Sequence, residues 1–160
     1  MEISFAIITC SDTRSLEEDE AGHTLAKDIE AHEGWSLIEH VICADDRSLI
    51  GKHIVHAIDK LKADIVLTCG GTGLSQRDVT PEATMDVCDR MVPGIAEAMR
   101  AHSLTITGRA MLSRALCMQK GSSLVINLPG STKAASENWE GIVDQIEHAV
   151  KMAGGGGHPA

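Results

Sequence analysis

Short, mostly apolar runs alternate with longer segments along the chain. The apolar runs are rich in β-branched residues, which is typical of strands buried on both faces of a sheet. They occupy residues 3–9, 36–42, 63–69 and 122–128. Helices are predicted over residues 24–33, 48–62, 80–90, 95–102 and 132–152. This alternation predicts an α/β fold, in which helices cover both faces of a mainly parallel central sheet as a three-layer α/β/α domain.

One helix is predicted from its start rather than from its apolar pattern. Thr80 can cap a helix, Pro81 suits the first helical position, and Glu82 complements the helix dipole. Two other regions have no clear periodicity. Residues 105–118 are predicted to form short strands, and the polar, acidic residues 11–22 are predicted to form a loop.

Length and composition are those of one globular domain. The chain has 160 residues, 43% of them hydrophobic, and we expect a single domain over residues 1–153. The remaining residues 154–160, GGGGHPA, predict a flexible tail. A net charge of −9 and a scarcity of aromatic residues argue against nucleic acid and anionic membranes as partners. No apolar run approaches membrane-spanning length, so a soluble cytoplasmic protein is expected.

The cysteines agree with a reducing compartment. Their number, five, is odd, and no two of them form a CxxC motif. Several lie in or beside apolar strands, which predicts buried free thiols rather than disulfides.

In parallel α/β folds, ligands bind at the carboxyl ends of the strands. The polar segments that follow the predicted strands are therefore the candidates for chemistry. They are Cys10-Ser11-Asp12, Asp45-Asp46, Gly70-Gly71-Thr72-Gly73 and Pro129-Gly130-Ser131-Thr132-Lys133.

The GGTG tetrapeptide at 70–73 has two interpretations. Glycines let a backbone approach a ligand closely and present its N–H groups to an anion. A tight strand-to-loop turn would need the same residues. The segment matches neither GxxxxGK[ST] nor GxGxxG, so it is not one of the common nucleotide loops.

Carboxylates follow two of the strands. Asp45 and Asp46 are solvated in the simplest interpretation, but at the ligand edge they offer the hard oxygen atoms that suit Mg²⁺. Asp78 either organises the helix start at Thr80 or binds a metal, and Arg77 is either its ion-pair partner or a ligand contact. Aspartates from two loops beside a glycine turn predict a magnesium–phosphate site.

The segment PGSTK opens the last predicted helix. Ser131 or Thr132 caps this helix in one interpretation. In the other, the same backbone N–H groups hold an anion and Lys133 adds positive charge.

Taken together, these motifs resemble the molybdenum-cofactor biosynthesis proteins of the MogA and MoaB type and the G domain of gephyrin. The resemblance rests on GGTG followed by RDVTPEA, and it covers nearly the whole chain. The order and spacing of the motifs agree with those of the family. The other matching segments are SDT at 11–13, DRMVPGIAEAMR at 89–100, MLSRA at 111–115 and INLPGSTKA at 126–134.

The resemblance implies a molybdopterin-binding fold and a nucleotidyltransferase that works as a trimer or hexamer. Molybdopterin and Mg-ATP would give adenylyl-molybdopterin and pyrophosphate, and the product would pass to a molybdate-insertion enzyme. Asp45 and Asp78 take the catalytic and metal-binding positions of the family. Its positions that contact molybdopterin or nucleotide map onto Ser11, Asp12, Gly70, Gly71, Thr72, Gly73, Arg77, Ser113, Arg114, Pro129, Gly130, Ser131 and Lys133.

Two alternatives stay open at this point. The chain has Cys43-Ala44-Asp45 where relatives commonly have Val-Pro-Asp, so Asp46 is a second candidate for the first catalytic acid. The alternative function is a molybdopterin-binding or scaffold protein of the MoaB type without transferase activity. The intact Arg77-Asp78 pair favours the enzyme.

Overall fold

The structure is a computed structural model, which describes residues 1–156. Its strands form one six-stranded sheet in the order β2-β1-β3-β6-β5-β4. The strands are β1 (Ile3–Cys10), β2 (Trp35–Cys43), β3 (Ile65–Cys69), β4 (Arg90–Met91), β5 (Cys117–Lys120) and β6 (Ser123–Leu128). The first four strands in this order are parallel, β5 pairs antiparallel with β6, and β4 pairs antiparallel with β5. The prediction of a mainly parallel sheet is confirmed.

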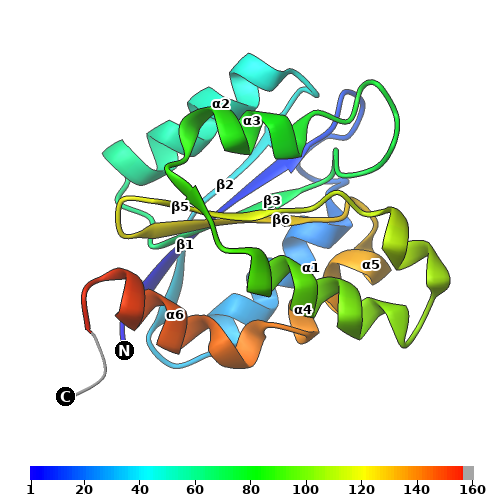
Figure 1. The fold of residues 1–160 in the computed structure, drawn as a ribbon. Coiled ribbons are helices and arrows are strands. Elements are labelled where there is room, and N and C mark those ends of the chain that lie inside the picture. Colours follow the sequence, from blue (N-terminus) through cyan, green and yellow to red (C-terminus); the bar gives the residue numbers. More distant parts are fainter. Residues whose placement is uncertain (157–160) are drawn as a thin grey trace.

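Helices cover both faces of the sheet, so the predicted three layers are also confirmed (Figure 1). On one face lie α2 (Arg47–Val55), which continues as the π-helical turn η1 (His56–Lys60), and α3 (Thr80–Val87). The other face carries α1 (Glu20–Ala31), α4 (Pro93–Leu104), α5 (Thr132–Glu140) and α6 (Ile146–Ala153). Each face has its own cluster of buried apolar side chains. Within the described residues, none of these helices has the length and apolar character needed to span a membrane.

The register of the parallel strands brings four polar segments to one edge. Cys10 at the end of β1 lies opposite Cys43 at the end of β2, and Cys69 at the end of β3 lies opposite Leu128 at the end of β6. The loops that follow these strands therefore emerge side by side at the carboxyl edge of the sheet.

Three sequence-based predictions about local structure were wrong. Thr80 does not cap α3: the N-cap position is Val79, and Thr80 is the first helical residue and fully buried. The predicted helix over 132–152 is broken after α5 at Gly141, a poor helix former, and continues through the short 3-10 turn η3 (Val143–Gln145) into α6. Residues 105–118 hold a 3-10 helix, η2 (Gly108–Leu112), and only the start of one strand, β5.

Two helix ends also differ from the prediction, for reasons of tertiary contact. The polar segment 11–22 is not all loop, because α1 begins at Glu20 behind Asp19, a buried aspartate that caps it. Helix α3 ends at Val87 rather than near Arg90, because β4 pairs with β5 immediately afterwards. The predicted tail falls partly outside the described residues, which end at residue 156.

Candidate functional site

A cavity of about 330 Å³ opens at the carboxyl edge of the sheet, where the loops after β1, β2, β3 and β6 meet. Eight of the predicted site residues line it: Ser11, Asp45, Gly70, Gly71, Thr72, Gly73, Asp78 and Gly130. Cys10, from the candidate segment after the first strand, also lines the cavity, as does Arg14, which was not predicted.

The glycine loop is both a tight turn and a close backbone approach. Gly70 and Gly71 have positive φ angles of 102° and 69°, which L side chains rarely adopt. A Cβ atom on Gly70 would lie 2.6 Å from the carbonyl oxygen of Cys10, and one on Gly71 would lie 2.2 Å from Thr80 Oγ1. The backbone N–H of Gly70 donates to the carbonyl of Leu128 at 2.9 Å. The two interpretations of this motif are therefore compatible, since the turn itself brings bare backbone to the cavity.

The neighbouring residues Asp45 and Asp46 have different structural roles. Asp46 is the N-cap of α2, where its Oδ1 accepts a hydrogen bond from Leu49 N at 2.9 Å. Asp45 lines the cavity, and its Oδ1 is buried with no hydrogen-bond partner among residues 1–156. Burial raises the pKa of Asp45, and the negative charges of Asp12 and Asp78 raise it further. A bound cation would relieve this unfavourable environment, so Asp45 could hold a metal ion.

Asp12 and Arg77 form an ion pair at the rim of the site rather than lining it. Arg77 Nε donates to Asp12 Oδ2 at 2.8 Å, and Arg77 Nη2 contacts the same oxygen. The other oxygen of Asp12 accepts from the backbone N–H of Asp45 at 3.0 Å. The hydrogen bond from Asp45 and the contact with Arg77 lower the pKa of Asp12. Arg77 therefore pairs with Asp12 rather than with Asp78, one of the two partners considered for it, and these contacts link three loops.

Asp78 lies in the cavity wall, close to the glycine loop. Its Oδ2 accepts from the backbone N–H of Ser75 at 3.2 Å. That hydrogen bond lies within the loop between β3 and α3 and helps to orient the side chain. Asp45 and Asp78 therefore reach one cavity from separate loops, as a shared cation requires.

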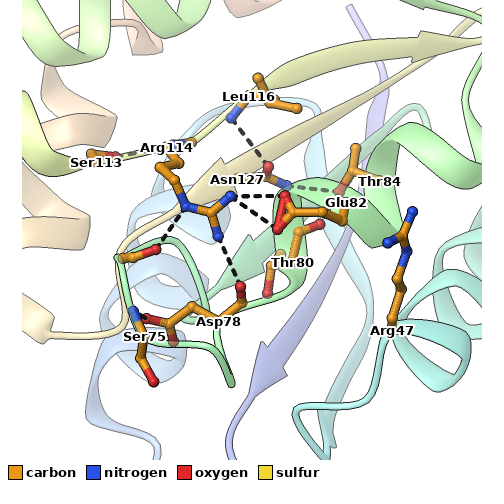
Figure 2. A network of polar contacts seen from close by, with 12 residues as sticks. Arg47, Ser75, Asp78, Thr80, Glu82, Thr84, Ser113, Arg114, Leu116 and Asn127 are labelled. Atoms are coloured by element: carbon orange, nitrogen blue, oxygen red, sulfur yellow. Dashed lines mark hydrogen bonds and ion pairs between the residues drawn. The ribbon is translucent and has the colours of Figure 1, made fainter.

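Arg114 holds the glycine loop against the start of α3 (Figure 2). Its Nε donates to the carbonyl of Gly73 at 2.8 Å, and its Nη2 donates to the carbonyl of Asp78 at 2.8 Å. Its Nη1 lies 2.9 and 2.8 Å from the two carboxylate oxygens of Glu82. The backbone N–H of Arg114 also donates to Thr72 at 2.9 Å. These contacts make Arg114 a residue that positions the loop.

A buried asparagine side chain on the sheet supports the same region through hydrogen bonds. Asn127, on β6, is fully buried, and its Nδ2 donates to Thr68 Oγ1 at 2.9 Å and to Thr84 Oγ1 at 3.0 Å. Its Oδ1 accepts from Leu116 N at 3.1 Å (Figure 2). This residue was not predicted from the sequence. The signal was available, because an asparagine inside the apolar run SLVINL would be buried, and a buried amide needs hydrogen-bond partners.

A second cavity, of about 240 Å³, adjoins the first through Thr72 and Gly73. Ser113 and Pro129 line this second cavity, so they belong to the same composite site as the glycine loop but not to its acidic part. Its lining includes polar residues that the motifs did not predict: Arg100, Ser103, Thr107, Arg109, Glu137 and Asn138.

Five predicted contact residues line neither cavity: Asp12, Arg77 and Arg114, described above, and Ser131 and Lys133. Ser131 is the N-cap of α5, where its Oγ accepts from Ala134 N at 3.3 Å. Lys133 is exposed on the first turn of α5, with Nζ 3.9 Å from Glu137 Oε1. Of the two interpretations of PGSTK, the structure displays the cap.

Cys10 is unsuited to nucleophilic catalysis despite its place in the cavity. Burial raises the pKa of Cys10 to about 12, so the side chain is a neutral thiol at physiological pH. Its role in the lining is that of a small apolar group.

The fold and the site together define a class of protein: an α/β domain with a mainly parallel sheet and an acidic cavity lined by a glycine loop at the carboxyl edge of that sheet. Comparison with known proteins agrees. Residues 6–148 match the family described as the probable molybdopterin binding domain. The chain therefore belongs to the molybdopterin-binding domain family.

Individual relatives are similar over nearly their full lengths. A Helicobacter pylori protein named molybdopterin adenylyltransferase is 37% identical over 153 residues, which is 94% of this chain and 87% of the relative. The solved structure of the molybdopterin biosynthesis enzyme MoaB from Thermus thermophilus has a TM-score of 0.86 and 35% identity, covering 96% of this chain and 97% of that one. The Mog protein of Mycobacterium ulcerans also has a TM-score of 0.86, with 32% identity over 94% of this chain and 99% of that one.

Proposed function

We propose that this protein catalyses the Mg-ATP-dependent adenylylation of molybdopterin, giving adenylyl-molybdopterin and pyrophosphate. The observation that carries the proposal is the cavity in which Asp45 and Asp78 meet beside the glycine loop, with one oxygen of Asp45 buried and unpaired. The molybdopterin adenylyltransferase of Helicobacter pylori supports the choice of reaction.

The carboxylates of Asp45 and Asp78 would hold Mg²⁺ together with phosphate oxygens of ATP. Within residues 1–156, no group of three or more His, Cys, Asp or Glu side chains is arranged to hold a metal ion alone. Mg²⁺ commonly takes one or two protein carboxylates and completes its coordination with substrate phosphates and water. When bound, Mg²⁺ neutralises phosphate charge and makes the α-phosphorus more electrophilic.

In this reaction, the terminal phosphate of molybdopterin attacks the α-phosphorus of ATP. A bond forms between the phosphate oxygen and the α-phosphorus, and the bond from the α-phosphorus to the bridging oxygen breaks as pyrophosphate leaves. The backbone of Gly70–Gly73 and the carboxylate of Asp78, from the loop after β3, and the carboxylate of Asp45, from the loop after β2, would orient these groups. Positioning and charge neutralisation supply most of the rate, since no protein nucleophile is required.

The second cavity would take a part of a substrate that lies beyond the reacting phosphates. It shares Thr72 and Gly73 with the acidic cavity, so one bound molecule can occupy both. Ser113 and Pro129 would contact the ligand there, while Ser11 and Gly130 would contact it in the acidic cavity. Asp12, Arg77 and Arg114 would hold the loops in place. Ser131 would cap α5, and Lys133 would supply positive charge at the first turn of that helix.

The decisive experiment combines purified protein with molybdopterin, ATP and Mg²⁺ and detects the AMP adduct by mass. Wild-type protein should form the adduct, Asp78→Asn should lose it, and omission of Mg²⁺ should abolish it. Asp86→Asn, which changes an exposed aspartate on α3, is the matched control and should keep full activity. Full adduct formation by Asp78→Asn would refute the assignment of the site.

A binding function without transfer is the second candidate. It is favoured by one observation: the chain is as similar in fold to a MoaB protein as to a Mog protein. Molybdopterin that binds to the wild type but is never adenylylated would establish this alternative.

We also propose the setting of the reaction. The protein would act in the cytoplasm as a homo-trimer or hexamer and pass its product to a molybdate-insertion enzyme. The free thiols of the described residues agree with a reducing compartment. Light scattering of the purified protein measures the assembly directly.

A further inference from the structure

Arg14 provides the positive charge of the acidic cavity. The residues that line this cavity in the described part of the chain include Asp45 and Asp78 as anions and Arg14 as the sole Lys or Arg. Arg14 lies in the loop after β1 and is half-buried. Its guanidinium Nη1 donates to the carbonyl of Gly130 at 3.2 Å, which directs the side chain across the cavity from the β1 loop to the β6 loop.

The backbone of Arg14 is fixed before any ligand arrives. Ser11 Oγ accepts hydrogen bonds from the backbone N–H groups of Thr13, at 3.3 Å, and Arg14, at 3.0 Å. The backbone N–H of Ser11 donates in turn to the carbonyl of Cys43 at 2.8 Å, on the neighbouring strand. The loop is therefore anchored to the sheet, and Arg14 enters the cavity in one direction. A preorganised cation loses little entropy when an anion binds.

Three other arginines near the site bond to protein partners, and Arg109 lines the second cavity rather than the acidic one. Arg77 pairs with Asp12 at the rim, and Arg114 uses its guanidinium on Gly73, Asp78 and Glu82. Arg100 donates to the carbonyls of Ser113 and Ala115. By contrast, the hydrogen bond to Gly130 engages a single guanidinium nitrogen of Arg14, and a guanidinium carries donors on all three nitrogens.

We propose that Arg14 binds phosphate oxygens of the nucleotide and of the pyrophosphate that leaves, opposite the carboxylates that hold the cation. This inference rests on the proposed function, because it assigns a residue within the same site. A guanidinium binds two phosphate oxygens at once, so Arg14 would hold the leaving group while the cation side of the cavity holds the reacting phosphate. The protein as a whole carries a net charge of −9, which makes a local cation necessary for an anionic ligand.

The test measures pyrophosphate binding by calorimetry in the presence of Mg²⁺, using wild type, Arg14→Gln and Arg14→Lys. Loss of the charged hydrogen bonds in Arg14→Gln should weaken binding by about 10- to 100-fold. Arg14→Lys should recover part of the loss, because it restores the charge without the two-pronged geometry. If Arg14 only supported Gly130 structurally, Arg14→Gln and Arg14→Lys would bind pyrophosphate with the same affinity.

Arg90→Gln is the matched control. Arg90 is an exposed arginine on β4 that bonds to Gln119, far along the sheet from β1, and its substitution should leave pyrophosphate binding unchanged. The binding assay does not depend on catalysis, so it separates two failures. A protein that binds pyrophosphate through Arg14 but never adenylylates molybdopterin would overturn the proposed function and keep this inference. Equal binding by wild type and Arg14→Gln, or no binding by wild type, would overturn the inference.

Discussion

Arg114 Nη1 lies within 2.9 Å of both carboxylate oxygens of Glu82, and the same guanidinium reaches the carbonyls of Gly73 and Asp78. One side chain thus ties the glycine loop to the first turn of α3. Both side chains of the pair are partly exposed, so the electrostatic attraction alone is modest. The hydrogen bonds to loop carbonyls give the pair its importance, because they determine where Asp78 stands.

We therefore expect Arg114→Lys to impair both stability and transfer. Lysine keeps the charge but cannot reach Glu82, Gly73 and Asp78 together, and the lost hydrogen bonds should lower the free energy of unfolding by about 1–3 kcal/mol. Denaturant unfolding and the adduct assay measure the two effects. Arg47→Lys is the control, since Arg47 makes a similar two-pronged pair with Asp86 on the exposed surface. Arg47→Lys should lower the free energy of unfolding by about 1 kcal/mol or less. Equal losses of stability in the two variants would contradict the positioning role of Arg114.

The sequence predicts four of the six strands well, because short apolar runs rich in β-branched residues between polar segments favour buried strands. The predicted strand over 63–69 is observed as Ile65–Cys69, and the predicted strand over 122–128 as Ser123–Leu128. The two-residue strand β4 escaped prediction because its pairing with β5 creates it, and no local pattern encodes such a short contact. The break at Gly141 likewise interrupts an apolar stripe that continues on both sides.

The site was predictable to the level of loops but not of individual side chains. Asp45 and Asp46 have the same chemistry, and only the start of α2 decides which one caps the helix. Arg14 escaped notice because an arginine in an acidic loop is usually solvated. Its place in the cavity depends on Gly130, more than a hundred positions away in the chain.

Substitutions of the two neighbouring aspartates, Asp45 and Asp46, should have different effects on transfer activity and stability. Asp45→Asn should reduce adduct formation by about 100-fold or more, because it removes a carboxylate that binds the cation. Asp46→Ala should remove the cap of α2, lower the free energy of unfolding by about 1 kcal/mol and leave most of the transfer activity. The adduct assay and thermal unfolding of each variant give the comparison. A larger loss of activity in Asp46→Ala would reverse the assignment.

The stability of Asp45→Asn at different pH values should also show that the pKa of the Asp45 carboxyl is raised in the folded protein. The pKa of Asp45 is raised in the folded protein, so its ionised form destabilises the fold at pH values above the folded pKa. The variant should therefore unfold at a temperature equal to or higher than that of the wild type at pH 7. Below about pH 3.8, the ordinary value, the advantage should disappear, because the wild-type carboxyl is then protonated in both states. A variant that is less stable at pH 7 would contradict the raised pKa.

The glycine loop should not tolerate a side chain at its second position. Gly71→Ala would place a Cβ atom 2.2 Å from Thr80 Oγ1 on a backbone with φ of 69°. We expect a loss of at least about 1–2 kcal/mol in the free energy of unfolding and a loss of phosphate binding, measured by unfolding and by calorimetry with pyrophosphate. Gly94→Ala on α4 is the control, because within residues 1–156 the added carbon meets no atom closer than 4 Å beyond its neighbours and the backbone of its own helix, and the stability of this variant should be unchanged or slightly higher. Similar losses in both variants would show that the loop geometry is not responsible.

Asp19 should make stability depend on pH in the opposite direction from Asp45. It is fully buried at the start of α1, and burial alone would raise its pKa. Its oxygens lie 2.7 Å from His40 Nε2, 2.5 Å from Thr9 Oγ1 and 3.1 Å from Gly22 N, and these contacts outweigh burial and lower the pKa of Asp19. A lowered pKa means that the folded state binds fewer protons than the unfolded state, so the stabilisation is present above the ordinary value and is lost as the pH falls through the folded pKa.

Asp19→Asn should therefore be less stable than the wild type by about 1–3 kcal/mol at pH 7, and the difference should shrink below about pH 3.8. Urea unfolding across this pH range measures it, with Asp144→Asn as an exposed control that should show little difference at any pH. Thr9 immediately precedes the cavity residues Cys10 and Ser11, so the variant should also weaken pyrophosphate binding somewhat. A difference in stability that stays constant down to low pH would mean that packing around Asp19, rather than its charge, holds the start of α1 in place.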